Sequence, residues 1–190
     1  MKYKLYKESL EIPDGLSVVE RLLIHRDIPK ERVQEYLNTT DEKHINDFLL
    51  LGSENLNQAA NIITKAMQEN QKALVVVDSD CDGFTSSAIL INYLYKINSE
   101  WVEDNLTWIM HSGKQHGLVH DLDFYKNFDI VLVPDAGSND YKMHDSLRAE
   151  GIEVIVIDHH EADVISPTAT IINNQLSDYP NKDFSGAGIV

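Results

Sequence analysis

Residues 74–83 read LVVVDSDCDG, and residues 157–160 read IDHH. Each stretch is an apolar run that ends abruptly on side chains able to bind a metal. Asp at every second position places anionic oxygens in one short turn, which is tolerated only where cations or solvent offset the repulsion. The two His residues add nitrogen ligands much later in the chain. Carboxylates with imidazole suit Mn²⁺, Mg²⁺ or Zn²⁺ better than Ca²⁺, which prefers sites made only of oxygen.

The first apolar run also indicates the fold. It is continuous and rich in β-branched residues, which is typical of a buried strand in a parallel sheet. The expected strands are 73–77, 106–110, 130–133, 153–157 and 170–172. Helical patterns lie between them at 85–95 and at 140–149, the second closed by Gly151. Strands that alternate with helices predict an α/β fold with a doubly wound parallel sheet and right-handed crossovers.

The region before the first strand has a different pattern. Apolar residues recur at helical spacing over residues 16–70, and Ser53 is a plausible start for the last of these helices. We therefore expect residues 1–70 to form a helical N-terminal lead-in segment. Residues 71–190 should form the α/β domain.

Three acidic residues lie just past the ends of predicted strands, namely Asp78, Asp135 and Asp158. Ligands of such sheets bind at the carboxyl ends of the strands, so these residues should share one site. After Asp135, Gly137 offers a flexible turn and Ser138 a hydroxyl, and we expect Ser138 or Asn139 to cap the following helix. Beside Asp158, an imidazole can ligate a metal while the carboxylate orients its other nitrogen.

The Asp-rich turn at 78–83 has three other interpretations. An EF-hand loop needs a Glu at its twelfth position, where this chain has Ile89, and it follows a helix rather than a strand. A haloacid-dehalogenase-type phosphatase would use Asp78 as nucleophile, but no clear partner motif follows. The turn can also simply cap the next helix, for instance through Asp82, although three Asp are more than a cap needs.

The loop at 111–118, HSGKQHGL, follows another predicted strand. Its Lys114 and His116 can meet a phosphate, and a solvated loop is an equally good interpretation. Four other His residues are expected at the surface: His25, His44, His120 and His144.

Composition narrows the functional classes. The net charge of -15 argues against a general polyanion-binding surface. One cysteine, Cys81, excludes an internal disulfide and fits a reducing cytoplasm. No apolar run approaches the ~20 residues that span a bilayer, and the N-terminus lacks the apolar segment of a signal peptide. We therefore expect a cytoplasmic protein without a membrane partner.

Together these motifs resemble the DHH phosphoesterases, and within them the RecJ-like single-strand exonucleases. The first motif matches with Ser79 in place of an aromatic residue, and small residues at the end of the chain resemble the start of the fourth motif. The resemblance spans roughly residue 16 to the end. The matching segments are 78–83, Asp135 with Gly137, 158–160 and 185–190, with 26–37 and 48–50 upstream.

The resemblance implies a metal-dependent phosphodiesterase, an exonuclease on single-stranded DNA in repair and recombination. Two divalent ions are implied, with Mn²⁺ expected and Mg²⁺ also suitable. The implied ligands are Asp80, Asp82, Asp135 as the bridge, and His159, with Asp78 as a ligand or a supporting group. His160 would contact the scissile phosphate and Asp158 would orient the His pair. Lys114, His116 and Ser138 are candidate substrate contacts.

Two departures from the family pattern matter. Many relatives have a His where this chain has Val76. The sequence also stops at Val190, before a further Asp ligand and a C-terminal substrate-binding domain that would be its partner in the same polypeptide. We therefore expect this chain alone to be inactive or weakly active. Two alternatives stay open: a DHH phosphodiesterase of oligoribonucleotides or cyclic dinucleotides, and a non-catalytic DHH-fold replication or repair module.

Overall fold

The computed structural model describes residues 15–38, 47–113 and 115–190. Contacts group the chain into two compact units, residues 1–45 and residues 46–190. The described part of the first unit holds helix α1 (Val18–His25), a 3₁₀ turn (Lys30–Arg32) and helix α2 (Val33–Leu37). Ser17 and Glu20 form a reciprocal capping box that starts α1. The expected helical character of this stretch is confirmed for the residues described.

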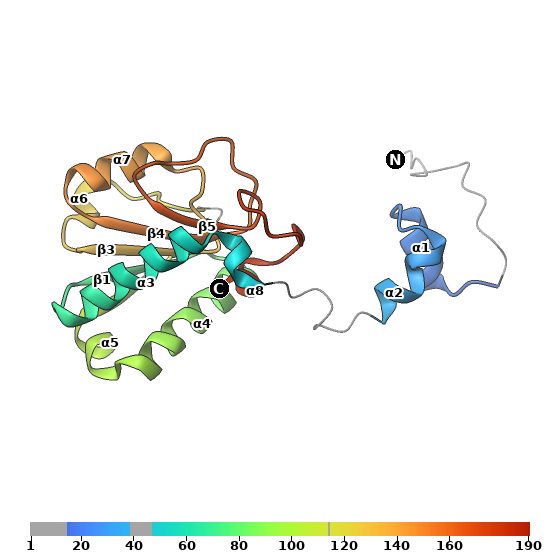
Figure 1. Ribbon diagram of the computed structural model, residues 1–190, viewed down its shortest axis with the longest axis horizontal. Helices are drawn as coiled ribbons and strands as arrows, with labels where there is room; N and C mark the ends of the chain where they lie inside the picture. The colour runs from blue at the N-terminus through green and yellow to red at the C-terminus, as the bar shows by residue number, and fades with distance from the viewer. Residues whose placement is uncertain (1–14, 39–46, 114) are drawn as a thin grey trace. The chain divides into compact units, whose positions relative to one another are not determined.

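A parallel five-stranded sheet organises the second unit, and it confirms the predicted α/β class (Figure 1). The strand order is β2-β1-β3-β4-β5, and every neighbouring pair is parallel. The strands are β1 (Ala73–Val77), β2 (Leu106–Met110), β3 (Ile130–Pro134), β4 (Glu153–Asp158) and β5 (Thr170–Asn173). All five lie within one residue of the predicted bounds, because each is a short apolar run between polar segments.

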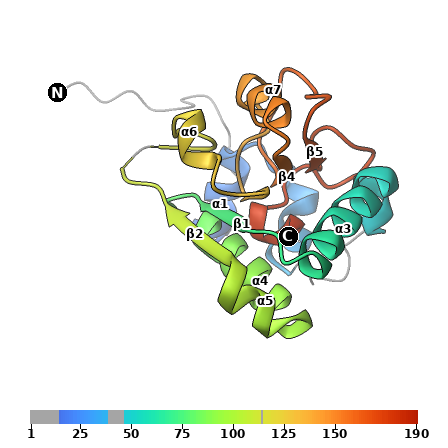
Figure 2. The same ribbon diagram turned by 90° about the vertical axis from the view of Figure 1, so that its left-hand side faces the viewer.

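Helices cover both faces of the sheet (Figures 1 and 2). One face packs against α3 (Ser53–Gln68), α4 (Cys81–Ile97) and α5 (Ser99–Asn105), together with the short α8 (Gly186–Ile189). The other packs against α6 (Leu122–Tyr125) and α7 (Tyr141–Ala149). A 3₁₀ turn, η3 (Phe48–Leu51), leads into α3. Because Ala59 and Ala66 of α3 are part of the buried core, this helix packs with the sheet in the second unit.

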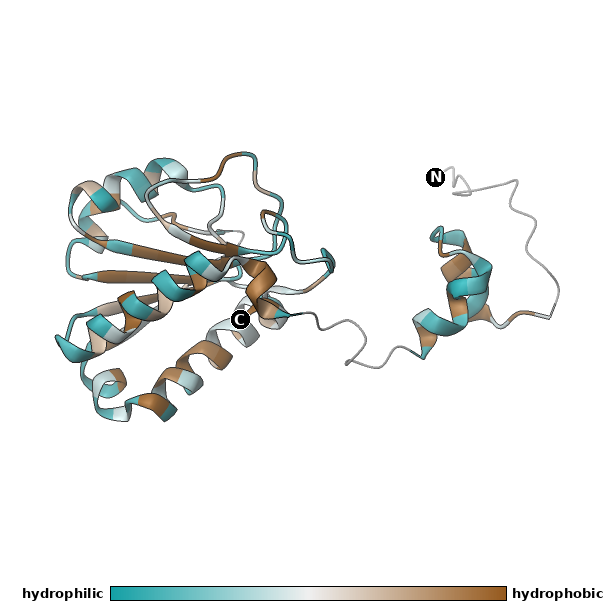
Figure 3. Ribbon diagram, viewed as in Figure 1, coloured by the Kyte–Doolittle hydropathy of each residue, from teal (hydrophilic) through white to brown (hydrophobic). Residues whose placement is uncertain are grey.

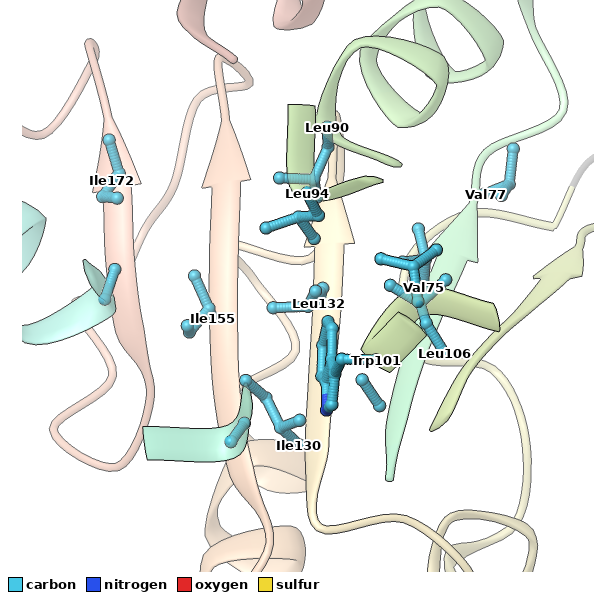
Figure 4. Close-up of a cluster of buried hydrophobic side chains, with 14 of the residues drawn as sticks. Val75, Val77, Leu90, Leu94, Trp101, Leu106, Ile130, Leu132, Ile155 and Ile172 are labelled. Carbon is cyan, nitrogen blue, oxygen red and sulfur yellow. The ribbon is translucent and has the colours of Figure 1, made fainter. Parts of the chain in front are cut away.

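Successive side chains of each strand point to opposite faces of the sheet, so each strand contributes to the core on both faces. On the first face, Val75 and Leu132 lie beside Leu94 and Trp101, as Figure 4 shows. On the other face, the alternate residues of the same strands pack against Tyr125 of α6 and Leu147 of α7. The hydropathy colouring shows the resulting apolar strands between helices with polar outer sides (Figure 3).

Several details differ from the sequence-based expectations. Helix α4 begins at Cys81, four residues before the predicted start at Thr85, because the Asp80 side chain accepts a hydrogen bond from the Gly83 N–H and caps it. Helices α5 and α6 were not predicted. Both are short, and α5 follows α4 after the single residue Asn98.

The predicted cap of α7 and one surface assignment are wrong. The residue before α7 is Asp140, and neither Ser138 nor Asn139 caps this helix, because both side chains bind elsewhere. His144 is fully buried on the inner side of α7 rather than exposed. His25 and His120 are partly exposed, and His44 lies outside the described residues. Across the described residues, the helices are too short or too polar to span a bilayer.

Candidate metal centre

The carboxyl ends of β1, β3 and β4 meet at one edge of the sheet because the three strands are parallel neighbours. Asp78 follows β1, Asp135 follows β3, and Asp158 is the last residue of β4. All three side chains are buried. The topology therefore brings together acids that are far apart in the sequence.

The Asp-rich turn after β1 presents its carboxylates in different ways. Asp80 Oδ1 accepts the Gly83 N–H at 2.9 Å, which ties Asp80 to the start of α4. Asp78 Oδ2 lies 2.7 Å from Nδ1 of His116. Gly83 allows this tight turn, since a Cβ atom there would lie 2.6 Å from Cβ of Asp78.

Asp135 is the centre of the cluster. Its backbone adopts the left-handed conformation, with φ of 72°, which Asp and Asn tolerate better than most residues. The residue is 1 % exposed, and its Oδ1 accepts no hydrogen bond from the part of the chain that the structure describes. Burial, with the nearby charges of Asp82 and Asp80, raises the pKa of Asp135 to about 7. Ionising a buried carboxylate that lacks a hydrogen bond is unfavourable, and a bound cation would offset the negative charge.

His159 faces the same point. Its Nδ1 lies 2.8 Å from the Phe184 carbonyl oxygen, which can only accept a hydrogen bond, so Nδ1 carries the proton. Its Nε2 is then left 3.2 Å from Asp135 Oδ1 and 3.5 Å from Asp82 Oδ2. A neutral imidazole would direct a lone pair at two carboxylate oxygens there. Protonation of the ring or a bound cation resolves this conflict, and a backbone partner on Nδ1 is typical of metal-binding His.

Asp158 fixes the second histidine. Its Oδ1 accepts the N–H groups of His159 and His160 at 2.7 and 3.1 Å and lies 2.8 Å from Nδ1 of His160. Burial alone would raise the pKa of Asp158, but hydrogen bonds from Ser138 and His160 outweigh it and hold that pKa below its ordinary value. Burial would likewise lower the pKa of His160, yet its hydrogen bond to Asp158 raises it. This is the geometry that the predicted orienting role of Asp158 requires.

Asp82 differs from the other acids. Its two oxygens accept the N–H groups of Gly186 and Ala187, in the first turn of α8, at 2.7 and 2.8 Å. Burial raises the pKa of Asp82, but these hydrogen bonds and His159 more than offset it, so the pKa lies below its ordinary value. Asp82 therefore anchors the small-residue helix that resembles the fourth motif. Its role as a metal ligand stays a prediction.

Two groups of side chains can each hold an ion. Asp135, His159 and His160 form one, and Asp78, Asp80 and Asp135 form the other, with ligand atoms in each group within 4.8 Å of one another. Both groups contain Asp135, as a bridging ligand would require. Mixed carboxylate and imidazole donors suit divalent ions such as Mn²⁺, Mg²⁺ or Zn²⁺. The residues present thus fit a pair of divalent ions.

The three predicted substrate contacts differ in where they lie relative to the site. His116 reaches the site, with its ring centroid 4.8 Å from that of His160. Ser138 is buried, its N–H donates to Asp158 Oδ2, and its Oγ accepts a hydrogen bond from Asn173. Contact of Ser138 with a substrate stays a prediction, as does that of Lys114, which lies outside the described residues.

Asn173 was missed in the sequence. Its side-chain amide holds Ser138 Oγ at 2.8 Å and the His160 carbonyl at 3.0 Å, so it ties the ends of β3 and β4 together. The available signal was its position directly after the predicted strand 170–172, where the other strands also place their polar residues.

Comparison with known proteins identifies relatives of this chain. A putative SPbeta prophage-derived single-strand DNA-specific exonuclease, YorK, of Bacillus subtilis is 42% identical over 136 residues, covering 71% of this chain and 23% of the relative. The single-stranded-DNA-specific exonuclease RecJ of Haemophilus influenzae is 30% identical over 187 residues, covering 94% of this chain and 32% of the relative. The chain thus spans about a quarter to a third of the length of these relatives.

Solved structures support the fold. A crystal structure of exonuclease RecJ bound to manganese superposes with a TM-score of 0.61 at 24% identity, over 71% of this chain and 35% of the other. RecJ of Thermus thermophilus in complex with Mn²⁺ gives 0.62 at 23% identity, over 95% of this chain and 26% of the other. Residues 72–190 match the model of the DHH family, N-terminal domain. The chain therefore belongs to the DHH family.

Proposed function

We propose that this chain is the DHH part of a metal-dependent phosphodiesterase, a RecJ-like exonuclease that hydrolyses single-stranded DNA in repair and recombination in the cytoplasm. The observation that carries the proposal is the buried carboxylate of Asp135, whose Oδ1 accepts no hydrogen bond from the described residues and which two groups of potential ligands share. The names of the relatives support the choice of single-stranded DNA as substrate.

The proposed ions are two Mn²⁺, for which Mg²⁺ can substitute. Asp78, Asp80, Asp135 and His159 would hold them, with Asp82 close enough to His159 to contribute. Bound divalent ions supply Lewis acidity, which activates water and stabilises charge on phosphoryl oxygens. Asp135 would keep both ions at a fixed point at the ends of β1 and β3.

The remaining side chains position the substrate. Asp158 holds Nδ1 of His160, so the other side of this ring is available to the scissile phosphate, and its raised pKa favours the cationic form that binds phosphate. His116 lies beside it and is about half exposed, so it can meet a neighbouring phosphate. Because the chain covers a minor part of its relatives, we propose that the rest of a longer polypeptide supplies most substrate binding.

The test is hydrolysis of a labelled single-stranded oligonucleotide by this chain, with enzyme in excess over substrate. We expect slow, Mn²⁺-dependent release of nucleotides that EDTA and Asp135→Asn both abolish. Cleavage that persists in the Asp135→Asn variant would identify a contaminant. Because the chain alone is expected to be inactive or weakly active, the non-catalytic alternative is tested with a longer polypeptide, in which Mn²⁺ binding without cleavage would favour it. Preference for dinucleotides would favour the small-substrate enzyme.

A further inference from the structure

Strand β2 forms an edge of the sheet, with α4 and α5 beside it (Figure 2). Side chains of β1, β2 and α4 line an apolar groove there. Its volume is about 230 Å³. The groove is lined by Val77, Phe84, Ser87, Ala88, Ile91, Asn92, Trp108 and Met110. None of these residues carries a charge, in a chain whose net charge is -15.

Its large side chains are unusually open to solvent. Trp108 is 58 % exposed, Met110 57 % and Phe84 46 %. Trp108 and Met110 lie on the same face of β2 as Leu106, but of these three residues only Leu106 is buried in the core. Contiguous exposed apolar side chains of this kind mark a binding surface more often than isolated ones do.

The groove is lined by residues that adjoin the candidate metal centre along the chain. Val77, which lines it, directly precedes Asp78, and Met110 is the register partner of Val77 on β2. Phe84 lies in the first turn of α4, the turn that Asp80 caps. We infer from this adjacency that a strand of nucleic acid with one phosphate at the metal centre places a neighbouring nucleotide near Trp108 and Phe84.

The groove also offers polar atoms beside its apolar walls. Ser87 is 3 % exposed, and its Oγ has no hydrogen-bond partner among the described residues. The Asn92 side chain is exposed at the same groove. Aromatic walls with a few hydrogen-bonding groups match a nucleobase, which has an apolar face and a polar edge.

We propose that this groove is a base-stacking subsite in which Trp108 and Phe84 hold a nucleobase of the single strand. The inference rests on the proposed function and names how that substrate is held. Stacking suits this chain because it needs no positive charge, and it accepts any base because every base has an aromatic face. A duplex cannot use the subsite without unstacking, so the groove would also favour single strands.

The experiment uses the intrinsic fluorescence of the chain, which has two tryptophans. Trp101 is buried and Trp108 is exposed, so quenching by a ligand reports on Trp108. The chain is titrated in EDTA with a short single-stranded deoxyadenosine oligonucleotide and with an abasic oligonucleotide that has the same number of phosphates. The variants are Trp108→Ala and Phe84→Ala, with Tyr93→Ala as the matched control, since Tyr93 is exposed on α4 outside the groove.

We expect the deoxyadenosine strand to quench the emission and the abasic strand to have little effect. Trp108→Ala and Phe84→Ala should each weaken binding about tenfold, as loss of one stacked base does, while Tyr93→Ala leaves it unchanged. For the variant without Trp108, affinity is measured by fluorescence anisotropy of a labelled strand.

Equal binding of the abasic strand, no binding at millimolar oligonucleotide, or equal weakening by Tyr93→Ala would overturn the proposal. Self-association of the wild-type chain that Trp108→Ala abolishes would instead assign the groove to a second copy. These titrations contain no metal, so they are independent of catalysis. Loss of hydrolysis with intact stacking would refute the proposed function alone, and the reverse result would refute the subsite alone.

Discussion

Replacing Asp135 by Asn should stabilise the metal-free chain while it abolishes metal binding. Asn is nearly isosteric with Asp and tolerates the left-handed backbone conformation at this position, so the fold should be kept. The substitution removes a carboxylate that is buried and unpaired at Oδ1. A residue maintained at the expense of stability is what a metal-binding function would require.

The magnitude follows from the pKa. Burial and neighbouring acids raise the pKa of Asp135 from an ordinary value of 3.8 to about 7. Since each pKa unit corresponds to about 1.4 kcal/mol, ionising this group costs about 4 kcal/mol more in the folded chain than in the unfolded one. The Asn amide is itself a polar group that stays buried without a full set of hydrogen bonds, which costs about 1–3 kcal/mol, so we expect a net gain near half of that value, about 2 kcal/mol.

Thermal unfolding in EDTA measures this gain. For a chain of this length, about 2 kcal/mol corresponds to a rise in melting temperature of roughly 4–8 °C. The sign of the pH dependence is also determined. Because the folded-state pKa of Asp135 is raised, the wild type loses stability as the pH rises from about 4 through about 7. The difference in stability between the variant and the wild type should therefore be largest near pH 8 and shrink toward pH 5, where Asp135 is protonated in the folded wild type.

Added Mn²⁺ should reverse the order of the two proteins. Binding to the native state alone stabilises the wild type by about 2.7 kcal/mol at a hundredfold excess over Kd, and the variant should not respond. A variant that is less stable than the wild type in EDTA near neutral pH would refute the claim that Asp135 is an uncompensated buried charge.

Three further outcomes are expected. Gly186→Ala should lower the free energy of unfolding by about 1–3 kcal/mol, because the new Cβ would overlap the Asp135 carboxylate. The same overlap should abolish the Mn²⁺-induced rise in melting temperature. The control Ala187→Gly keeps the N–H that binds Asp82 and should retain this rise. His144→Gln should flatten the acid side of the stability profile, measured by urea unfolding. Burial lowers the pKa of His144, so the wild type loses stability as the pH falls below about 6.5. His116→Ala should weaken oligonucleotide hydrolysis without removing metal binding, since His116 belongs to neither group of potential ligands and contacts the site through Asp78 and His160. A metal titration of this variant checks it.

Much of the fold could be predicted because its strands are short, continuous and apolar. The runs at 73–77 and 106–110 were placed without error, and their polar ends identified the edge where Asp78, Asp135 and Asp158 meet. What could not be predicted depends on tertiary contacts. Only the folded chain shows that Asp82 binds the first turn of α8, that His116 pairs with Asp78, and that Asn173 joins two strand ends.

The burial of His144 shows the same limit. Its sequence neighbourhood, 140–149, is polar, and the hydrophobic pattern there is weak. Only the packing of α7 on the sheet, with Leu147 one turn away on the same inner side, shows which residues of the helix are covered. Likewise, the exposed face of β2 follows from its place at the sheet edge, which the strand's own sequence does not reveal.

The most direct test of the central claim is a calorimetric titration of this chain with Mn²⁺, wild type against Asp135→Asn. Because both groups of potential ligands contain Asp135, we expect the wild type to bind two ions and the variant to lose both. Binding in the variant with unchanged stoichiometry and affinity would contradict a metal centre shared through Asp135.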